Sequence, residues 1–241
     1  MKKKMASDYV RFLQAIPQPV QRSPEWFEQR SKLITSSNIP TILGDNPYKK
    51  PNEYLEELLD PTLRVFTGNV ATIHGQVYET PAVDAYCDAF NYAGVELGLI
   101  RLIDNPQHRD YARIREFNLD WVAGSADNLT WPKEIEHPQQ DDCITVEIKC
   151  PFNSPKLKWG EMPKYYHAQV MFNMFILDTP RADFIQMIPH GFKGQSYQMN
   201  IIRVYRDDAW IWNYALPKLE EFYGEWQTRK SKKQRKLTNG V

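Results

Sequence analysis

The chain has 241 residues, of which 42% are hydrophobic and 13% aromatic, enough to bury one substantial core. Even its most apolar stretches, such as Met171 to Leu177, are far shorter than the roughly 20 residues that a membrane-spanning helix needs. Polar residues follow Lys2 to Lys4 where an export signal would place its apolar stretch. We therefore expect one intracellular domain that does not enter a membrane.

The formal net charge is zero, but the charges are unevenly distributed. Three lysines near the N-terminus and six basic residues between Arg229 and Lys236 leave 21 basic against 30 acidic residues between them. A body of this charge needs divalent cations or a local basic groove to approach nucleic acid. The cysteines Cys87, Cys143 and Cys150 form no CxxC pair, which argues against a zinc knuckle or a disulfide framework and fits a reducing compartment.

The first half of the chain predicts an arm followed by helices. Residues 1–22 contain a short helix and then Pro17 and Pro19, which favour an extended arm. Ser23 and Pro24 have the form of a helix start, and a second cap cluster at 35–38 opens a helix that ends at Gly44. Leucines and acids at helical spacing predict a third helix over 52–59, and residues 72–90 give the clearest amphipathic helix, with Pro81 near its start.

The second half predicts a sheet. We expect strands over 95–103, 143–150, 182–189 and 197–205, a strand or turn leading from 121 to Asp127, and a polar, exposed excursion over 128–142. Residues 111–117 are ambiguous, 165–177 read as a helix, and 208–229 as a terminal helix interrupted at Pro217. The expected fold is α/β, a central mixed β-sheet of about five strands flanked by helices, with the active site at one sheet edge. A single domain over 23–228 would lie between the arm and a basic tail, 229–241.

The residues that carry chemistry are Asp127, Glu147 and Lys149. Glu147 and Lys149 alternate on one strand, so they share a face while Ile148 enters the core and its carbonyl remains available. A hairpin that brings Asp127 beside Glu147 would make a carboxylate cluster of hard oxygen ligands, which suit Mg2+ or Mn2+. The Glu-x-Lys pattern alone is typical of a cross-strand ion pair, but here the flanking apolar residues predict burial, where charge is costly unless paired or metal-bound.

Five blocks, in order, resemble the phage lambda exonuclease and YqaJ-like viral recombinase nuclease family, a branch of the restriction-endonuclease-like PD-(D/E)xK superfamily. They are Trp26-Phe27-Glu28-Gln29-Arg30 with Ile34-Thr35-Ser36-Ser37, then His74-Gly75-Gln76-Val77-Tyr78-Glu79, Gly124-Ser125-Ala126-Asp127, Glu147-Ile148-Lys149-Cys150-Pro151-Phe152 and His167-Ala168-Gln169-Val170. One departure is Ala126, where family members commonly have proline.

The resemblance implies a role for each matching residue. Asp127 and Glu147 would be the principal metal ligands, with the Ile148 carbonyl beside them and Glu79 completing the site. Lys149 would position the attacking water, and Gln169 would contact the water or the scissile region. Arg30, Ser37 and Ser125 resemble a pocket for a 5′-terminal phosphate, which the forked donors of arginine suit.

The function that the resemblance implies is a metal-dependent deoxyribonuclease with a Mg2+ cofactor, for which Mn2+ could substitute. The favoured mode is 5′ to 3′ digestion of one strand of double-stranded DNA from 5′-phosphate ends, for recombination or viral DNA processing in the host cell cytoplasm or nucleus. A single-strand annealing protein is an expected partner, and a homo-oligomer is left open. The alternatives are an endonuclease or RNA-directed nuclease with the same site, and a catalytically silent DNA-binding protein.

Overall fold

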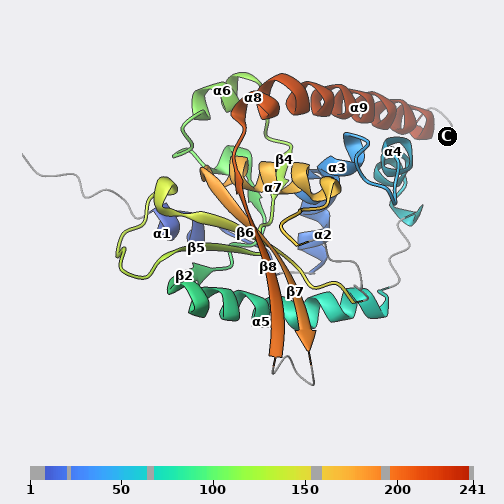
Figure 1. Ribbon diagram of the computed structural model, residues 1–241. Helices are drawn as coiled ribbons and strands as arrows, with labels where there is room; N and C mark the ends of the chain where they lie inside the picture. The colour runs from blue at the N-terminus through green and yellow to red at the C-terminus, as the bar shows by residue number, and fades with distance from the viewer. Residues whose placement is uncertain (1–8, 21–22, 64–67, 153–158, 191–195, 239–241) are drawn as a thin grey trace, which may run out of the picture.

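A computed structural model describes residues 9–20, 23–63, 68–152, 159–190 and 196–238, and its centre is a mixed five-stranded sheet (Figure 1). The strand order is β2-β5-β6-β7-β8, and of these pairs only β6 with β7 is parallel. The strands are β2 (Tyr92–Val95), β5 (Asn128–Pro132), β6 (Ile144–Lys149), β7 (Arg181–His190) and β8 (Ser196–Tyr205). The expected mixed sheet flanked by helices is confirmed.

A second, smaller sheet has the order β1-β4-β3. Its strands are β1 (Ile34–Thr35), β4 (Val122–Gly124) and β3 (Ile100–Arg101), with β1 parallel to β4. The short β1 thus ties the segment that follows the first helices to the strand that precedes Asp127.

Two helices cover opposite faces of the five-stranded sheet (Figure 1). Helix α5 (Val70–Phe90) buries Ala82 and Tyr86 against Val146 and Ile148, while α7 (Lys164–Ile176) packs on the other face. Strand alternation therefore turns Ile148 toward α5 and Glu147 toward α7, as the period-two pattern predicts.

The remaining helices surround these layers. They are α1 (Tyr9–Gln14), α2 (Pro24–Ser31), α3 (Ile39–Ile42), α4 (Pro51–Leu59), α6 (Tyr111–Glu116), α8 (Asp208–Trp210) and α9 (Leu216–Thr238), with 3-10 turns at Ser36–Asn38, Pro61–Leu63, Leu102–Asp104 and Gln140–Asp142. Within the described ranges, no helix has both the length and the apolar character that crossing a membrane requires.

Several predicted helix boundaries are confirmed by capping contacts. The Ser23 hydroxyl accepts a hydrogen bond from the Trp26 N–H at 3.2 Å, and α2 begins with Pro24. Helix α5 is capped by Asn69 and passes through Pro81 without ending, so Pro81 lies in its middle. The terminal helix is not broken at Pro217, which is the second residue of α9; a π-helical turn, Ile211–Ala215, departs from the α-helix just before it.

Two predicted elements are wrong. The single strand over 95–103 is in fact the end of β2 and the separate β3, with Gly98 at a φ of +71° between them. The excursion over 128–142 begins with β5, in which Leu129 and Thr130 are fully buried, so only its middle part is exposed. The polar composition of this segment hid a strand that is buried on both faces.

The two ends of the chain are more closely packed than the predicted arm and tail suggest. Tyr9 and Leu13 of α1 are fully buried in the main core, and the Tyr9 hydroxyl donates to the Leu177 carbonyl at 2.7 Å. Helix α9 continues through Arg229 without a break. The division of the chain at residues 22 and 228 stays a prediction, but residues 9–14 pack as part of the body.

Candidate active site

The pairing of β5 with β6 places Asp127 beside Glu147. Asn128 lies opposite Val146, and the Asp127 N–H donates to the Val146 carbonyl at 3.1 Å. The Asp127 carboxylate in turn accepts from the Ile148 N–H at 2.6 Å. The hairpin expected from the sequence therefore forms, although β6 is the central strand of the sheet, so the expected position at a sheet edge is wrong.

Glu147 is fully buried and accepts three hydrogen bonds. Its Oε1 atom receives Lys149 Nζ and Gln169 Nε2, both at 2.5 Å, and its Oε2 atom receives Asn173 Nδ2 at 2.9 Å. Gln169 and Asn173 are one turn apart on α7, so both point at the same strand position. The helix and the strand together fix the orientation of this carboxylate.

The site is buried and holds more acidic than basic side chains. Burial, and then the charge of Asp127, raise the pKa of Glu147 to about 8. Burial also raises the pKa of Asp127. For Lys149, burial opposes the charged form, but Glu147 and Asp127 outweigh it and raise the pKa, so the lysine stays protonated. One lysine thus faces two carboxylates.

Glu79 lies on the exposed side of α5 and contributes to the same region. It lines a cavity of about 1060 Å³ together with Ile148 and Lys149, and a smaller one of about 250 Å³ together with Asp127. Its charge also raises the pKa of Glu147 and, after burial, that of the Cys150 thiol. The three predicted catalytic acids and Lys149 are therefore neighbours.

The donor atoms suit a hard cation. Among the residues that the structure describes, no three His, Cys, Asp or Glu side chains gather closely enough to hold a metal by themselves. The Ile148 carbonyl oxygen is also available. The N–H and C=O of one strand residue point to the same side of the strand. The Ile148 N–H points to Asp127, beyond the last residue pair between β5 and β6, so the Ile148 carbonyl points to that side too. Carboxylate and carbonyl oxygens with uncompensated negative charge fit Mg2+ or Mn2+.

Arg30 and Ser37 line a second cavity of about 1010 Å³. The Arg30 guanidinium lies 4.6 Å from the centre of the Trp26 ring and donates to the Thr35 hydroxyl at 3.5 Å. The Thr35 hydroxyl is also 3.1 Å from that of Ser37. An arginine and two hydroxyl groups therefore line this cavity, and these donors suit an anion.

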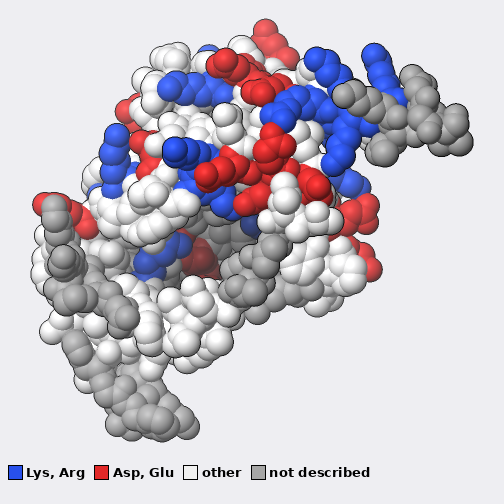
Figure 2. Space-filling view, turned by 90° about the vertical axis from the view of Figure 1, so that its right-hand side faces the viewer, with Lys and Arg blue, Asp and Glu red and all other residues white. Residues whose placement is uncertain are grey.

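The two large cavities meet at α5, where Thr72 and Gln76 line both. Figure 2 shows this face of the molecule hollowed, with basic and acidic atoms at its floor. Ser125, by contrast, is half-buried and lines neither cavity. The structure thus brings Arg30 and Ser37 to one cavity, while the parallel pairing of Thr35 with Ala123 runs the segment before Ser125 alongside the segment before Ser37.

Sequence reasoning missed Asn173, which is 1% exposed and bonded to Glu147. Its Oδ1 atom lies close to Gly124, where an added Cβ would be 2.8 Å from Oδ1 and 3.2 Å from the Ser36 hydroxyl. Gly124 is therefore required by close packing of β4 against α7. The signal was present, because Asn173 follows Gln169 by four residues.

The fold has relatives among solved structures. An alkaline exonuclease, LHK-Exo from Laribacter hongkongensis, matches with a TM-score of 0.63 and 20% identity over 91% of this chain and 100% of that chain. A phage related exonuclease from Haemophilus somnus 129PT matches with a TM-score of 0.53 and 14% identity over 85% of this chain and 96% of that chain. The fold is therefore restriction-endonuclease-like, as the sequence predicts.

The family follows from sequence comparison. Residues 25–180 match the YqaJ-like viral recombinase domain, and the chain belongs to this family. It is also 28% identical over 183 residues to protein R354 of Acanthamoeba polyphaga mimivirus, covering 72% of this chain. This chain spans 30% of the length of that relative.

Proposed function

We propose that the protein is a Mg2+-dependent deoxyribonuclease that digests one strand of double-stranded DNA from a 5′-phosphate end. The observation that carries the proposal is the continuity of the two cavities at Thr72 and Gln76. One cavity offers Arg30 to a terminal phosphate, and the other offers Lys149 beside two carboxylates. The family and the names of the two solved exonucleases support the same activity.

Asp127, Glu147, the Ile148 carbonyl and Glu79 would hold the cation. When bound, Mg2+, or Mn2+ in its place, lowers the pKa of a coordinated water and stabilises charge on the phosphate oxygens. Lys149, kept protonated by its two acidic neighbours, orients the nucleophile by donating a hydrogen bond. Gln169 and Asn173 hold Glu147 in place from α7.

The polarity of digestion would come from the Arg30 cavity. A guanidinium matches two phosphate oxygens at once, and Ser37, with Ser125 as the second predicted hydroxyl, would add neutral donors. Attack on the next phosphate then releases a product that carries a 5′-phosphate and leaves a 3′ overhang. A single-strand annealing protein would be the natural recipient of that overhang, and assembly of the chain into a homo-oligomer stays a prediction.

The test compares initial rates on linear duplexes that differ only in a 5′-phosphate or 5′-hydroxyl end, with a closed circular duplex and a single-stranded RNA beside them. We expect digestion of the linear DNA in Mg2+, faster from the phosphorylated end, and none in EDTA. Arg30→Ala should remove the advantage of the phosphate, and Arg30→Lys should restore it only in part. Equal rates on both ends, with nicking of the circle, would favour the endonuclease alternative.

A further inference from the structure

Three tyrosines form a continuous row along the wall of the cavity that contains Lys149. The ring centroids of Tyr48 and Tyr165 are 6.0 Å apart, and those of Tyr165 and Tyr166 are 4.4 Å apart. The Lys149 Nζ atom lies 5.2 Å from the centre of the Tyr166 ring. All four side chains line the same cavity. The row therefore connects the mouth of the cavity to the base of the carboxylate site.

The outer ring of this row is held out into solvent. Tyr48 is 81% exposed, but its backbone is fixed, because its N–H donates to Asn46 Oδ1 at 2.9 Å. The Asn46 amide donates in turn to the buried Thr41 hydroxyl at 2.8 Å. Burial, and then the neighbouring Tyr166 and Tyr48, raise the pKa of Tyr165, so its phenol is neutral. An exposed aromatic face on a hydrogen-bonded backbone is suited to stacking against a flat partner.

Tyr48 lies where the two large cavities meet. It lines the cavity that contains Lys149, while the next residue, Lys49, lines the cavity that contains Arg30. Thr72 and Gln76 of α5 line both. A nucleotide that reaches from a phosphate site at Arg30 to a scissile phosphate at Lys149 therefore has the exposed Tyr48 ring within the cavity that it enters.

We propose that Tyr48 and Tyr165 form a subsite for the nucleobase of the 5′-terminal nucleotide, which leaves its complement and stacks on the exposed Tyr48 ring. This inference rests on the proposed function and names the part of the substrate that this wall of the cavity binds. The ligand class is a 5′-nucleotide with any base, since every base offers a π-face and stacking tolerates sequence. Unpairing at the end separates the digested strand from the one that is kept.

A double-mutant cycle between protein and substrate tests the subsite. Two linear duplexes carry the same 5′-phosphate and differ in whether the terminal nucleotide has its base or is abasic. Stacking of one base contributes enough for a change on the order of tenfold. Tyr48→Ala should lower kcat/KM about tenfold on the complete end and leave the abasic end unchanged, while Tyr48→Phe, which keeps the ring, should retain the preference.

The matched control is Tyr205→Ala, because Tyr205 is a 69% exposed tyrosine on β8 that lines neither cavity. It should leave both rates at the wild-type value. Equal losses on the two ends in Tyr48→Ala would overturn the subsite while leaving the nuclease assignment intact.

A binding measurement separates the subsite from catalysis. With 2-aminopurine as the terminal base, binding in EDTA should change its fluorescence in the wild type and in Tyr48→Phe but not in Tyr48→Ala. Absence of any digestion by the wild type would contradict the proposed function, whereas an unchanged 2-aminopurine signal in all three proteins contradicts the subsite alone.

Discussion

At the scale of single residues, the site depends on one protonated lysine between two carboxylates. The pKa of Lys149 is raised by Glu147 and Asp127 against the effect of burial, so this side chain is a donor and cannot serve as a metal ligand. Its contact with Glu147 and its position over the Tyr166 ring both fix the ammonium group. The role that we propose for it is orientation of the nucleophile.

We expect Lys149→Ala to lower the cleavage rate by at least about a hundredfold, which is the usual scale for a positioned proton donor. The affinity for DNA should change little, because Lys149 acts on the attacking water and is not a metal ligand. Single-turnover digestion and binding of a labelled duplex in EDTA measure the two quantities separately. Substantial turnover by Lys149→Ala in Mg2+ would remove this side chain from the mechanism.

Asp127→Asn should weaken binding of the cation, since it replaces an anionic oxygen by a neutral amide near a hard cation. The fold should persist, because an amide oxygen can still accept from the Ile148 N–H. Titration calorimetry with Mn2+ measures the affinity directly. Asp84→Asn is a matched control, since Asp84 also lines the small cavity with Glu79 but belongs to no predicted ligand set. An unchanged affinity in Asp127→Asn would contradict the assignment of this ligand.

At the scale of elements, the sequence predicts the site better than it predicts its supports. Strand alternation places Glu147, Ile148 and Lys149, and helical spacing places Glu79 and Gln169, because these rules are local. Asn173 and the row of tyrosines depend on which helix packs on which strand, which is long-range information. The strand β5 was missed for a related reason, since Thr130 is buried by its neighbours in the sheet and its polarity gives no sign of that.

The basic end of α9 is an element whose role the structure redefines. Arg229 pairs with Glu56, and Lys233 donates to the Leu59 carbonyl at 3.0 Å, so part of the predicted tail packs on α4. Lys232 and Arg235 are exposed, and Figure 2 shows basic side chains gathered at this end of the molecule. A DNA backbone can reach exposed side chains such as these.

Exchanging Lys232 and Arg235 for glutamine should therefore weaken binding of all duplexes alike, whether their ends are phosphorylated or not. The salt dependence should flatten by about 0.9 in the log-log slope for each phosphate that the variant no longer neutralises. Fluorescence anisotropy at several salt concentrations provides the slope. Lys218→Gln, exposed on the same helix, is the control. An identical slope in the double variant would show that this end of α9 does not touch DNA.

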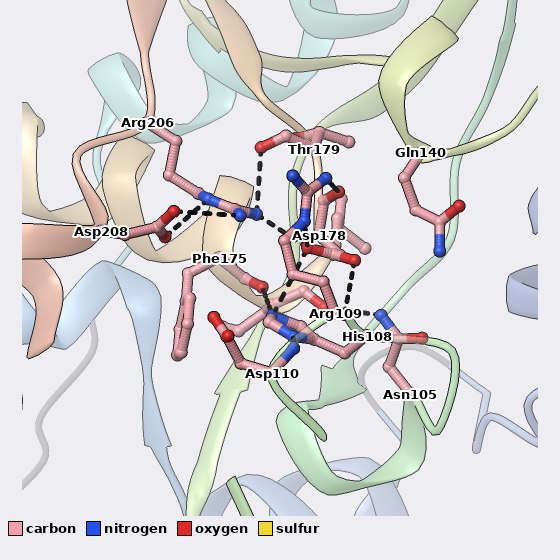
Figure 3. Close-up of polar contacts among 12 residues, drawn as sticks. Asn105, His108, Arg109, Asp110, Gln140, Phe175, Asp178, Thr179, Arg206 and Asp208 are labelled. Atoms are coloured by element: carbon pink, nitrogen blue, oxygen red, sulfur yellow. Dashed lines mark hydrogen bonds and ion pairs between the residues drawn. The ribbon is translucent and has the colours of Figure 1, made fainter. Parts of the chain in front are cut away.

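At the scale of the whole molecule, a buried ion cluster joins segments that are distant in sequence (Figure 3). Asp178, 1% exposed, follows α7 and accepts from the Arg109 guanidinium at 2.6 Å and from that of Arg206 at 2.9 Å. Removing either cationic partner of a buried carboxylate strongly destabilises the folded protein, because the carboxylate charge is then left uncompensated. The cluster thus fastens the end of α7, whose other turns hold Glu147, to the loop before α6 and to the segment after β8.

His108 makes this cluster sensitive to pH. It is 4% exposed, its Nε2 atom donates to the Phe175 carbonyl at 2.7 Å, and its Nδ1 atom accepts from the Asp110 N–H at 2.9 Å. That arrangement needs the neutral ring, since a proton on Nδ1 would meet the Asp110 N–H. Asp178, at 3.8 Å, favours the charged form, while Arg206 opposes it. Burial is the largest effect, and the pKa of His108 is lowered.

Because the pKa of His108 is lower in the folded protein, there is a pH range in which the unfolded chain binds a proton that the folded protein does not bind. The free energy of unfolding is therefore undiminished above the unfolded pKa of about 6.5 and falls as the pH drops from there toward the folded pKa, by at most about 1.4 kcal/mol per pH unit for one proton.

His108→Gln keeps a donor for the Phe175 carbonyl and has no proton to gain, so its stability should fall less between pH 7 and 5. Urea unfolding at a series of pH values measures this slope, with the exposed His137→Gln as control. Some slope should remain, because burial also lowers the pKa of His167. If His108→Gln and the wild type lose stability in parallel, His108 is not the group that ties this cluster to pH.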